Sequence, residues 1–309
     1  MKPALTPQLA HPVAIPGLQL LEIIGRGTHS VVYRAQQNQQ TYAVKIQLRA
    51  SSTNSDATIR FRREAAILAS LHHPALARIV TVGNVQGHAY LVMDYIDGQA
   101  LATAIAEGPL PESRIVSIAN DIAGALIEVH HHGLIHRDIK PYNILLDKTG
   151  NATLIDFDLA MRMRGAVVDD IIGTLAYSAP EQTGMLKRPV DGRTDLYALG
   201  VVLFECATGC LPFLADDVAE LVRQHAVQPP ANVRAINRDI SPALAAIIAK
   251  LLAKDPDDRY QTAAALLTDM QQLNMFNNAL AVAQPIVLGA HTVEQHQRGS
   301  VLIGRGKRL

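Results

Sequence analysis

A short polar stretch in the middle of the chain holds the side chains best suited to chemistry. Residues 136–143 read His-Arg-Asp-Ile-Lys-Pro-Tyr-Asn and lie between apolar segments. Asp138, Lys140 and Asn143 supply a carboxylate, an ammonium group and an amide, which can converge on one phosphate and one metal ion. A second carboxylate, Asp156, closes an apolar strand, where its oxygens suit Mg²⁺. These residue types favour chemistry on a phosphate group.

A lysine in an apolar strand is the second candidate. Lys45 stands in the run Ala-Val-Lys-Ile, and burial of its ammonium group is costly without an anionic partner. Glu64, on the helix predicted next, is the candidate partner. The alternative is that Lys45 lies on an edge strand and reaches solvent.

A turn with two glycines precedes that lysine. Gly25 and Gly27 separate two predicted strands, and glycine lets backbone N–H groups approach phosphate oxygens closely. The turn is not a dinucleotide-binding fingerprint, since a strand rather than a helix follows it. It also lacks the Gly-Lys-Ser/Thr sequence of a Walker loop. By itself it indicates a turn that can cover a phosphate.

The elements that must position these residues change character along the chain. Up to residue 95 the pattern is mostly strands, and after residue 98 it is mostly helices. This α+β pattern predicts a small antiparallel sheet lobe with one helix, joined to a larger, mainly helical lobe, with a ligand cleft between them. The predicted strands are 18–24, 31–33, 41–46, 79–85 and 88–95, with a helix over 59–71. The later helices are 115–130, 194–206, 217–225, 242–252 and 262–273, with short strands near 134–155.

The chain is expected to divide into four segments. They are a flexible leader over 1–17, the sheet lobe over 18–96, the helical lobe over 97–273 and a tail of unknown role over 274–309. The prolines of the leader exclude the apolar helix of a signal peptide. No apolar run reaches the ~18 residues of a membrane helix. We therefore expect a cytoplasmic protein without a membrane partner.

The balance of positive and negative charge limits the classes of partner that the chain can bind. The 309 residues include 28 Lys or Arg and 28 Asp or Glu, so the formal net charge is zero. Binding to nucleic acid or to a membrane surface generally needs excess positive charge, so neither is expected as a partner. The two cysteines, Cys206 and Cys210, are predicted to lie on one face of a helix as reduced thiols.

Taken together, these motifs resemble those of eukaryotic-like protein kinases in order and spacing. The resemblance covers about residues 18–273 and favours the bacterial serine/threonine branch. It implies the two-lobed protein kinase fold and transfer of the γ-phosphoryl group of Mg-ATP to Ser or Thr of protein substrates, with autophosphorylation as a further reaction. The matching residues are Gly25-x-Gly27, Ala43-Val-Lys45, Glu64, 136–143, Asp156-Phe157, Gly173-Thr174, Ala179-Pro180-Glu181, 195–200 and 257–259.

The resemblance also implies roles for single residues. Asp138 would orient the substrate hydroxyl, Lys140 would neutralise the transferred group, and Lys45 would hold ATP phosphates and pair with Glu64. Glu181 with Arg259, and Asp195 beneath the catalytic loop, would be structural ties. The implied Mg²⁺ ligands are Asn143 and Asp156. The implied nucleotide-binding residues are Ile24, Gly25, Arg26, Gly27, Thr28, His29, Ser30, Val31, Val32, Ala43, Lys45, Met93, Asp94, Ile96 and Leu145.

The sequence departs from the family pattern at two positions. Ser30 replaces the third glycine of the turn, and Asp158 replaces the glycine after Asp-Phe. We hypothesise that Asp158 stiffens this segment, because Asp reaches glycine-like backbone conformations less freely. In addition, no Ser or Thr lies between Asp156 and Gly173, which favours activity without phosphorylation of the segment from Asp156 to Glu181.

Two other functions remain open. A kinase-like scaffold would keep the fold as a binding module, and the changes at Ser30 and Asp158 favour it. The presence of Lys45, Asp138 and Asp156 counts against it. A small-molecule kinase of related fold would generally lack both the Arg of His-Arg-Asp and the Ala-Pro-Glu segment, which this chain has.

Overall fold

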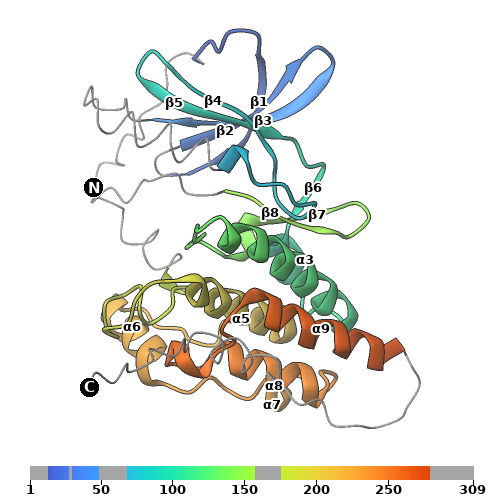
Figure 1. Ribbon diagram of the computed structural model, residues 1–309, viewed down its shortest axis with the longest axis vertical. Helices are drawn as coiled ribbons and strands as arrows, with labels where there is room; N and C mark the ends of the chain where they lie inside the picture. The colour runs from blue at the N-terminus through green and yellow to red at the C-terminus, as the bar shows by residue number, and fades with distance from the viewer. Residues whose placement is uncertain (1–12, 28–29, 49–67, 157–174, 279–309) are drawn as a thin grey trace, which may run out of the picture.

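The computed structural model describes residues 13–27, 30–48, 68–156 and 175–278. Strands gather at one end of the molecule and helices at the other, as Figure 1 shows. The chain passes from the first part to the second within residues 95–97, between strand β5 (His88–Asp94) and strand β6 (Gly98–Ala100). A strand-rich lobe followed by a helical lobe confirms the predicted fold class.

The first lobe is built on one antiparallel sheet. Its strand order is β1-β2-β3-β5-β4, so β3, which carries Lys45, is the central strand. The alternative that Lys45 lies on an edge strand is therefore wrong. The remaining strands are β1 (Gln19–Arg26), β2 (Ser30–Gln37), β3 (Gln40–Gln47) and β4 (Ile79–Val85).

Tight turns set the register of this sheet. The β2–β3 hairpin turns through Asn38 and Gln39, whose φ angles are 47° and 66°. The predicted β4–β5 hairpin is confirmed, with Gln86 and Gly87 at φ angles of 53° and 83°. Positive φ at both central residues twists a hairpin in the same sense as its strands.

Apolar residues of the sheet bury on both faces. On β2, Val31, Tyr33 and Ala35 are buried and alternate with less buried residues, as expected of a strand with one covered face. They form one cluster with Val44 and Ile46 of β3. Residues of the opposite face, such as Ala43 and Met93, belong to the larger core that continues into the second lobe.

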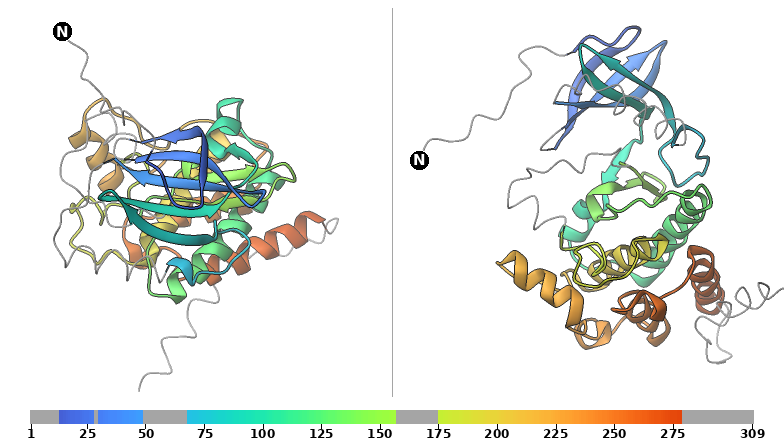
Figure 2. Two further views of the ribbon diagram at one scale, coloured as in Figure 1. Left: turned by 90° about the horizontal axis from the view of Figure 1, so that it is seen from above. Right: turned by 60° about the vertical axis from the view of Figure 1, so that its left-hand side comes forward.

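The second lobe is mainly helical. Helix α5 (Gly192–Thr208) runs through its centre, and nearly all of its side chains are buried. Figure 2 shows the helices lying in layers below the three-stranded sheet β6-β7-β8. The other elements are α2 (Leu101–Ala106), α3 (Glu112–His131), η1 (Pro141–Asn143), β7 (Ile144–Asp147), β8 (Ala152–Leu154), α6 (Val218–Val227), α7 (Val233–Ile236), α8 (Pro242–Leu251), η2 (Pro256–Asp258) and α9 (Ala263–Asn278).

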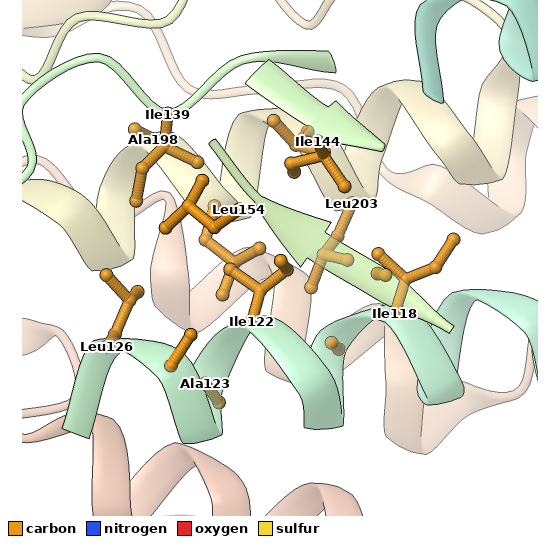
Figure 3. Close-up of a cluster of buried hydrophobic side chains, with 14 of the residues drawn as sticks. Ile118, Ile122, Ala123, Leu126, Ile139, Ile144, Leu154, Ala198 and Leu203 are labelled. Carbon is orange, nitrogen blue, oxygen red and sulfur yellow. The ribbon is translucent and has the colours of Figure 1, made fainter. Parts of the chain in front are cut away.

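The polar stretch 136–143 is anchored to the apolar core of this lobe. Ile118, Ile122 and Leu126 of α3 point toward β8 and α5 in Figure 3. Ile139 lies in the same cluster and is 1% exposed, although it stands between two polar residues of the loop. Burial of an isoleucine side chain stabilises by about 1.5–3 kcal/mol, which pins the middle of the loop.

The structure corrects three expectations about the ends of elements. The leader was expected to be flexible up to residue 17, but Val13 and Ile15 are each 4% exposed and pack on the first sheet. The last helix continues to Asn278, beyond the expected end at Leu273. Cys210 does not share a helical face with Cys206, because Gly209, with φ of 74°, ends α5 between them.

The sequence reading did not predict β6, α2 or α7, which are too short to show a period. Among the described residues, no helix combines the length and apolar character that crossing a membrane requires.

Candidate active site

A buried carboxylate fixes the backbone of the loop 134–143. Asp195, on α5, is fully buried and accepts the backbone N–H groups of His136 at 2.9 Å and Arg137 at 2.8 Å. It also lies 2.8 Å from Nε2 of His130, at the end of α3. Asp195 thus joins two helices to the loop, which confirms the expected structural tie.

Two residues of the site have strained backbones. Arg137 and Asp156 have φ angles of 67° and 63°, in the left-handed region that most residues avoid. Such conformations cost about 1–3 kcal/mol and persist where the surroundings over-determine them. At Arg137 the surroundings include the bond to Asp195.

Two polar side chains of the loop contact the carboxylate of a third, Asp138. Lys140 Nζ lies 2.9 Å from Asp138 Oδ1. Asn143 Nδ2 donates to the Asp138 backbone carbonyl and to its Oδ2, both at 2.8 Å. The carboxylate of Asp138 is therefore oriented from both sides, while about a fifth of its side-chain surface stays exposed.

The second charged pair bridges the two lobes. Lys45 of β3 forms an ion pair with Asp156, just after β8, and the exposed fractions of the two side chains are 11% and 31%. The predicted burial of Lys45 is confirmed, and the anion beside it is Asp156, whereas the expected partner, Glu64, lies outside the described residues.

Backbone hydrogen bonds connect the two charged groups. Ile155 N donates to the Asn143 carbonyl at 2.9 Å, and the Ile155 carbonyl lies 3.2 Å from His136 Nε2. Because Ile155 directly precedes Asp156, these bonds place the Lys45–Asp156 pair beside the loop of Asp138 and Asn143. Residues far apart in sequence thus form one polar site.

The other residues expected to bind a nucleotide lie on elements around this site. Val32 of β2 pairs in register with Lys45, and Met93, at the end of β5, is buried. Ile24 on β1 is 44% exposed, so part of an apolar surface is open there. The described members are Ile24, Gly25, Arg26, Gly27, Ser30, Val31, Val32, Ala43, Lys45, Met93, Asp94, Ile96 and Leu145.

One of these expected residues is engaged elsewhere. Asp94 accepts two hydrogen bonds from Arg78, at 2.9 and 3.1 Å, so its side chain joins the end of β5 to the residue before β4. Its backbone N–H also donates to the Arg78 carbonyl, at 3.0 Å. Thr28, His29, Glu64, Phe157, Asp158, Gly173 and Thr174 lie outside the described residues.

A buried ion pair holds the segment that follows. Arg259 donates to both oxygens of Glu181, at 2.7 and 2.9 Å, and both side chains are fully buried. Thr194 donates to the same carboxylate at 2.9 Å. The expected tie between Glu181 and Arg259 is confirmed.

Sequence reasoning missed two contacts of the site. It did not predict that the ring of His130, in the last turn of α3, contacts Asp195. It also did not see that the Tyr177 hydroxyl donates to Glu205 at 2.7 Å. Burial raises the pKa of both Tyr177 and Glu205, so the phenol stays protonated. Neither contact has a local signal, because each joins residues on different elements.

Comparisons with known proteins agree with this geometry. The sequence profile described as "Protein kinase domain" matches residues 18–270. The serine/threonine-protein kinase PknB of Mycolicibacterium smegmatis is 36% identical over 264 residues, which cover 82% of this chain and 42% of PknB. The serine/threonine-protein kinase PrkC of Bacillus subtilis is 34% identical over 262 residues, covering 82% of this chain and 40% of PrkC.

A solved structure shares the fold as well. The kinase domain of PknI from Mycobacterium tuberculosis matches with a TM-score of 0.66 and 27% identity, over 84% of this chain and 97% of that domain. The chain spans less than half the length of the curated relatives given above. It belongs to the protein kinase domain family and, within that family, to the bacterial serine/threonine-protein kinases.

Proposed function

We propose that this chain transfers the γ-phosphoryl group of Mg-ATP to Ser and Thr hydroxyls of protein substrates. One observation carries the proposal. The carboxylate of Asp138, oriented by Lys140 and Asn143, lies in the same site as the Lys45–Asp156 pair. This is the set of charges that phosphoryl transfer needs, because the reaction depends on positioning and on neutralising negative charge.

The residues present fit ATP and Mg²⁺. The buried ammonium group of Lys45 suits phosphate oxygens, and the Asp156 carboxylate and the Asn143 Oδ1 suit a hard cation. The described residues contain no cluster of three or more His, Cys, Asp or Glu that could cage a metal alone. That agrees with Mg²⁺, which is commonly held by one or two carboxylates together with substrate phosphates.

Each polar residue of the site has its own role in the proposed transfer. ATP supplies the phosphoryl group, and Mg²⁺ neutralises charge on its oxygens. Asp138 accepts the proton of the substrate hydroxyl at one carboxylate oxygen. Lys140, 2.9 Å from that carboxylate, balances negative charge beside it. Lys45 holds phosphate oxygens, and Asn143 keeps Asp138 turned toward the substrate.

An Asp138→Asn variant tests the proposal. The purified chain is incubated with Mg²⁺, labelled ATP and a generic basic protein, and phosphoserine and phosphothreonine are measured. Loss of the proton acceptor should slow transfer by about 10²–10⁴-fold, while ATP binding is kept. Asp239→Asn is the matched control, because Asp239 is an exposed carboxylate of the helical lobe, away from the site.

Other outcomes would favour the other functions. ATP binding by the wild-type chain without any transfer, to itself or to protein, would support a scaffold. Transfer to a small molecule but not to protein would support a small-molecule kinase. Equal labelling by wild type and Asp138→Asn would contradict the assigned role of Asp138.

We also propose that the activity does not require phosphorylation of the segment from Asp156 to Glu181. No Ser or Thr lies between Asp156 and Gly173 of this segment, and Asp169 and Asp170 carry negative charge there. Phosphatase-treated protein should phosphorylate substrate at the rate of untreated protein. An essential phosphate mapped to Thr174, Tyr177 or Ser178 would contradict this.

We place the reaction in the cytoplasm, since its proposed donor, ATP, is available there. The activity, substrates and partners of the whole protein belong to the same proposal, because the chain covers only part of its relatives' length.

A further inference from the structure

A short segment before the first strand is packed as part of the sheet lobe. Residues 13–17, here called the strap, alternate between buried and exposed side chains. Val13 and Ile15 are each 4% exposed, whereas Ala14 and Pro16 are exposed. The strap therefore turns one apolar edge inward, as an extended chain does.

The strap lies on the sheet without joining it. Pro16 has no backbone N–H, so it cannot continue a strand ladder. Leu18 N donates to the Ile15 carbonyl at 3.1 Å, and Gly17, with φ of 79°, completes the turn into β1. A Cβ at Gly17 would stand 2.9 Å from Gln37 Nε2, which also favours glycine. The turn thus aims Val13 and Ile15 at the sheet.

The strap packs on the face of the sheet opposite Lys45. Val13 and Ile15 belong to one buried cluster with Val44 and Ile46, which are both fully buried. These two residues flank Lys45 in β3, and successive side chains of a strand point to opposite faces. The strap and the Lys45 ammonium group therefore lie on opposite faces of the same strand.

We infer that the strap is a positioning element, which holds β3 so that Lys45 meets Asp156 and a bound nucleotide. The inference rests on the proposed function only for the nucleotide. Without Val13 and Ile15, water would reach the apolar face of Val44 and Ile46, and the strand would open more often. Functional groups need to be held within about 0.5 Å of their productive positions. More frequent opening of β3 would therefore make the position of the Lys45 ammonium group less well defined.

The test compares two double variants. V13A/I15A removes apolar groups from the buried cluster. L21A/V80A removes similar groups from residues that are 42% and 40% exposed on the same lobe. Hydrogen exchange of the β3 amides is measured without nucleotide, and KM for ATP and kcat are measured at a temperature where circular dichroism shows both variants folded.

V13A/I15A should accelerate exchange in β3 by at least about tenfold, with β7 and β8 unchanged. It should raise KM for ATP several-fold and change kcat less, because Lys45 holds the nucleotide. L21A/V80A should change neither quantity. I15V, which keeps most of the buried side chain, should leave both values close to those of wild type. Single V13A replaces the double variant if that variant does not fold.

Unchanged β3 exchange and KM in V13A/I15A would overturn the inference, as would acceleration spread evenly over both lobes. If the wild-type chain does not bind ATP, the proposed function fails. The exchange measurement still decides whether the strap holds β3.

Discussion

The polar residues of the site are oriented by hydrogen bonds from neighbouring side chains. Asp138 is oriented by Lys140 and Asn143, and its loop is oriented by Asp195. Asp195 is fully buried and accepts bonds from three groups, which together engage both oxygens of its carboxylate. Removing one acceptor oxygen would leave a buried donor without a partner, and this costs about 1–3 kcal/mol.

Asp195→Asn should therefore reduce both stability and catalysis. The amide has only one acceptor oxygen for three donors, so the backbone of Arg137 loses support for its positive φ. We expect unfolding free energy to fall by about 1–3 kcal/mol and kcat to fall at least about tenfold. Urea unfolding and steady-state kinetics measure these.

Asp217→Asn is the control for that substitution. Asp217 caps α6 by accepting Glu220 N at 3.0 Å, and Asn caps a helix about as well as Asp. Wild-type stability and kcat are expected. An Asp195→Asn variant with the stability and kcat of this control would contradict the role assigned to Asp195.

At the scale of elements, ion pairs and close packing hold α5 against its neighbours. The Glu181–Arg259 pair joins the segment after residue 174 to the turn before α9, through a fully buried contact beside α5. Gly200 of α5 lies against α8, so a Cβ there would stand 2.6 Å from Leu251 Cβ. Both contacts are buried, so water cannot replace the partner that a substitution removes.

Breaking the buried pair should destabilise strongly. Glu181→Gln leaves the Arg259 charge buried without its counterion, which typically costs about 3–5 kcal/mol. The midpoint of thermal unfolding should fall by roughly 2–4 °C for each kcal/mol. Asp255→Asn, which breaks the exposed pair with Arg188, should shift the midpoint little. Equal shifts in the two variants would contradict this difference.

Gly200→Ala should destabilise the chain even though alanine favours helices. Helix propensity alone would stabilise by about 1 kcal/mol, but the clash with Leu251 requires α5 and α8 to move apart. We expect a net loss of about 1–3 kcal/mol in chemical unfolding. Ala246→Gly, at an exposed position inside α8, measures the propensity difference alone. A Gly200→Ala variant more stable than wild type would disprove the packing argument.

At the scale of the whole molecule, one buried histidine couples stability to pH. His225 is 1% exposed, packs on Phe213 with ring centroids 4.9 Å apart, and lies 3.0 Å from the Tyr197 hydroxyl. Burial, and then the Lys254 charge, lower the pKa of His225 to about 4. Lys254, whose pKa is lowered to about 8 by burial and by Arg259, stays protonated below neutral pH.

Stability should therefore fall as pH falls below about 6.5. Between pH 6.5 and 4 the unfolded chain binds a proton at residue 225 and the folded chain does not, so acid favours unfolding. Two pKa values of 6.5 and about 4 give a loss of about 2 kcal/mol between pH 7.5 and 5. A His225→Gln variant should lose about 2 kcal/mol less than wild type over this range.

The matched control is His131→Gln, at an exposed histidine at the end of α3. It should keep the pH dependence of wild type. Other groups also titrate in this range, such as Asp121, the pKa of which is raised by burial. Their contributions are the same in wild type and in His225→Gln, so they cancel in the difference between the two profiles. Identical pH profiles for wild type and His225→Gln would show that His225 does not contribute.

Most of the fold could be predicted from the sequence, because its long elements carry a clear period. The alternation on β2 and the helical spacing of α3 are local properties, set by which side chains must leave water. The ends of elements were harder to predict where a single residue stops a helix, as Gly209 stops α5. The strap was missed, because two apolar residues among prolines show no periodic pattern.

Residue types and their spacing along the chain determined which side chains could carry out phosphate chemistry. Asp138, Lys140 and Asn143 are close in sequence, so one loop suffices to bring them together. Only the tertiary structure decided that Lys45 meets Asp156 and that His130 supports Asp195. Such contacts join groups from separate elements, and they depend on how whole lobes and helices pack, which no local pattern encodes.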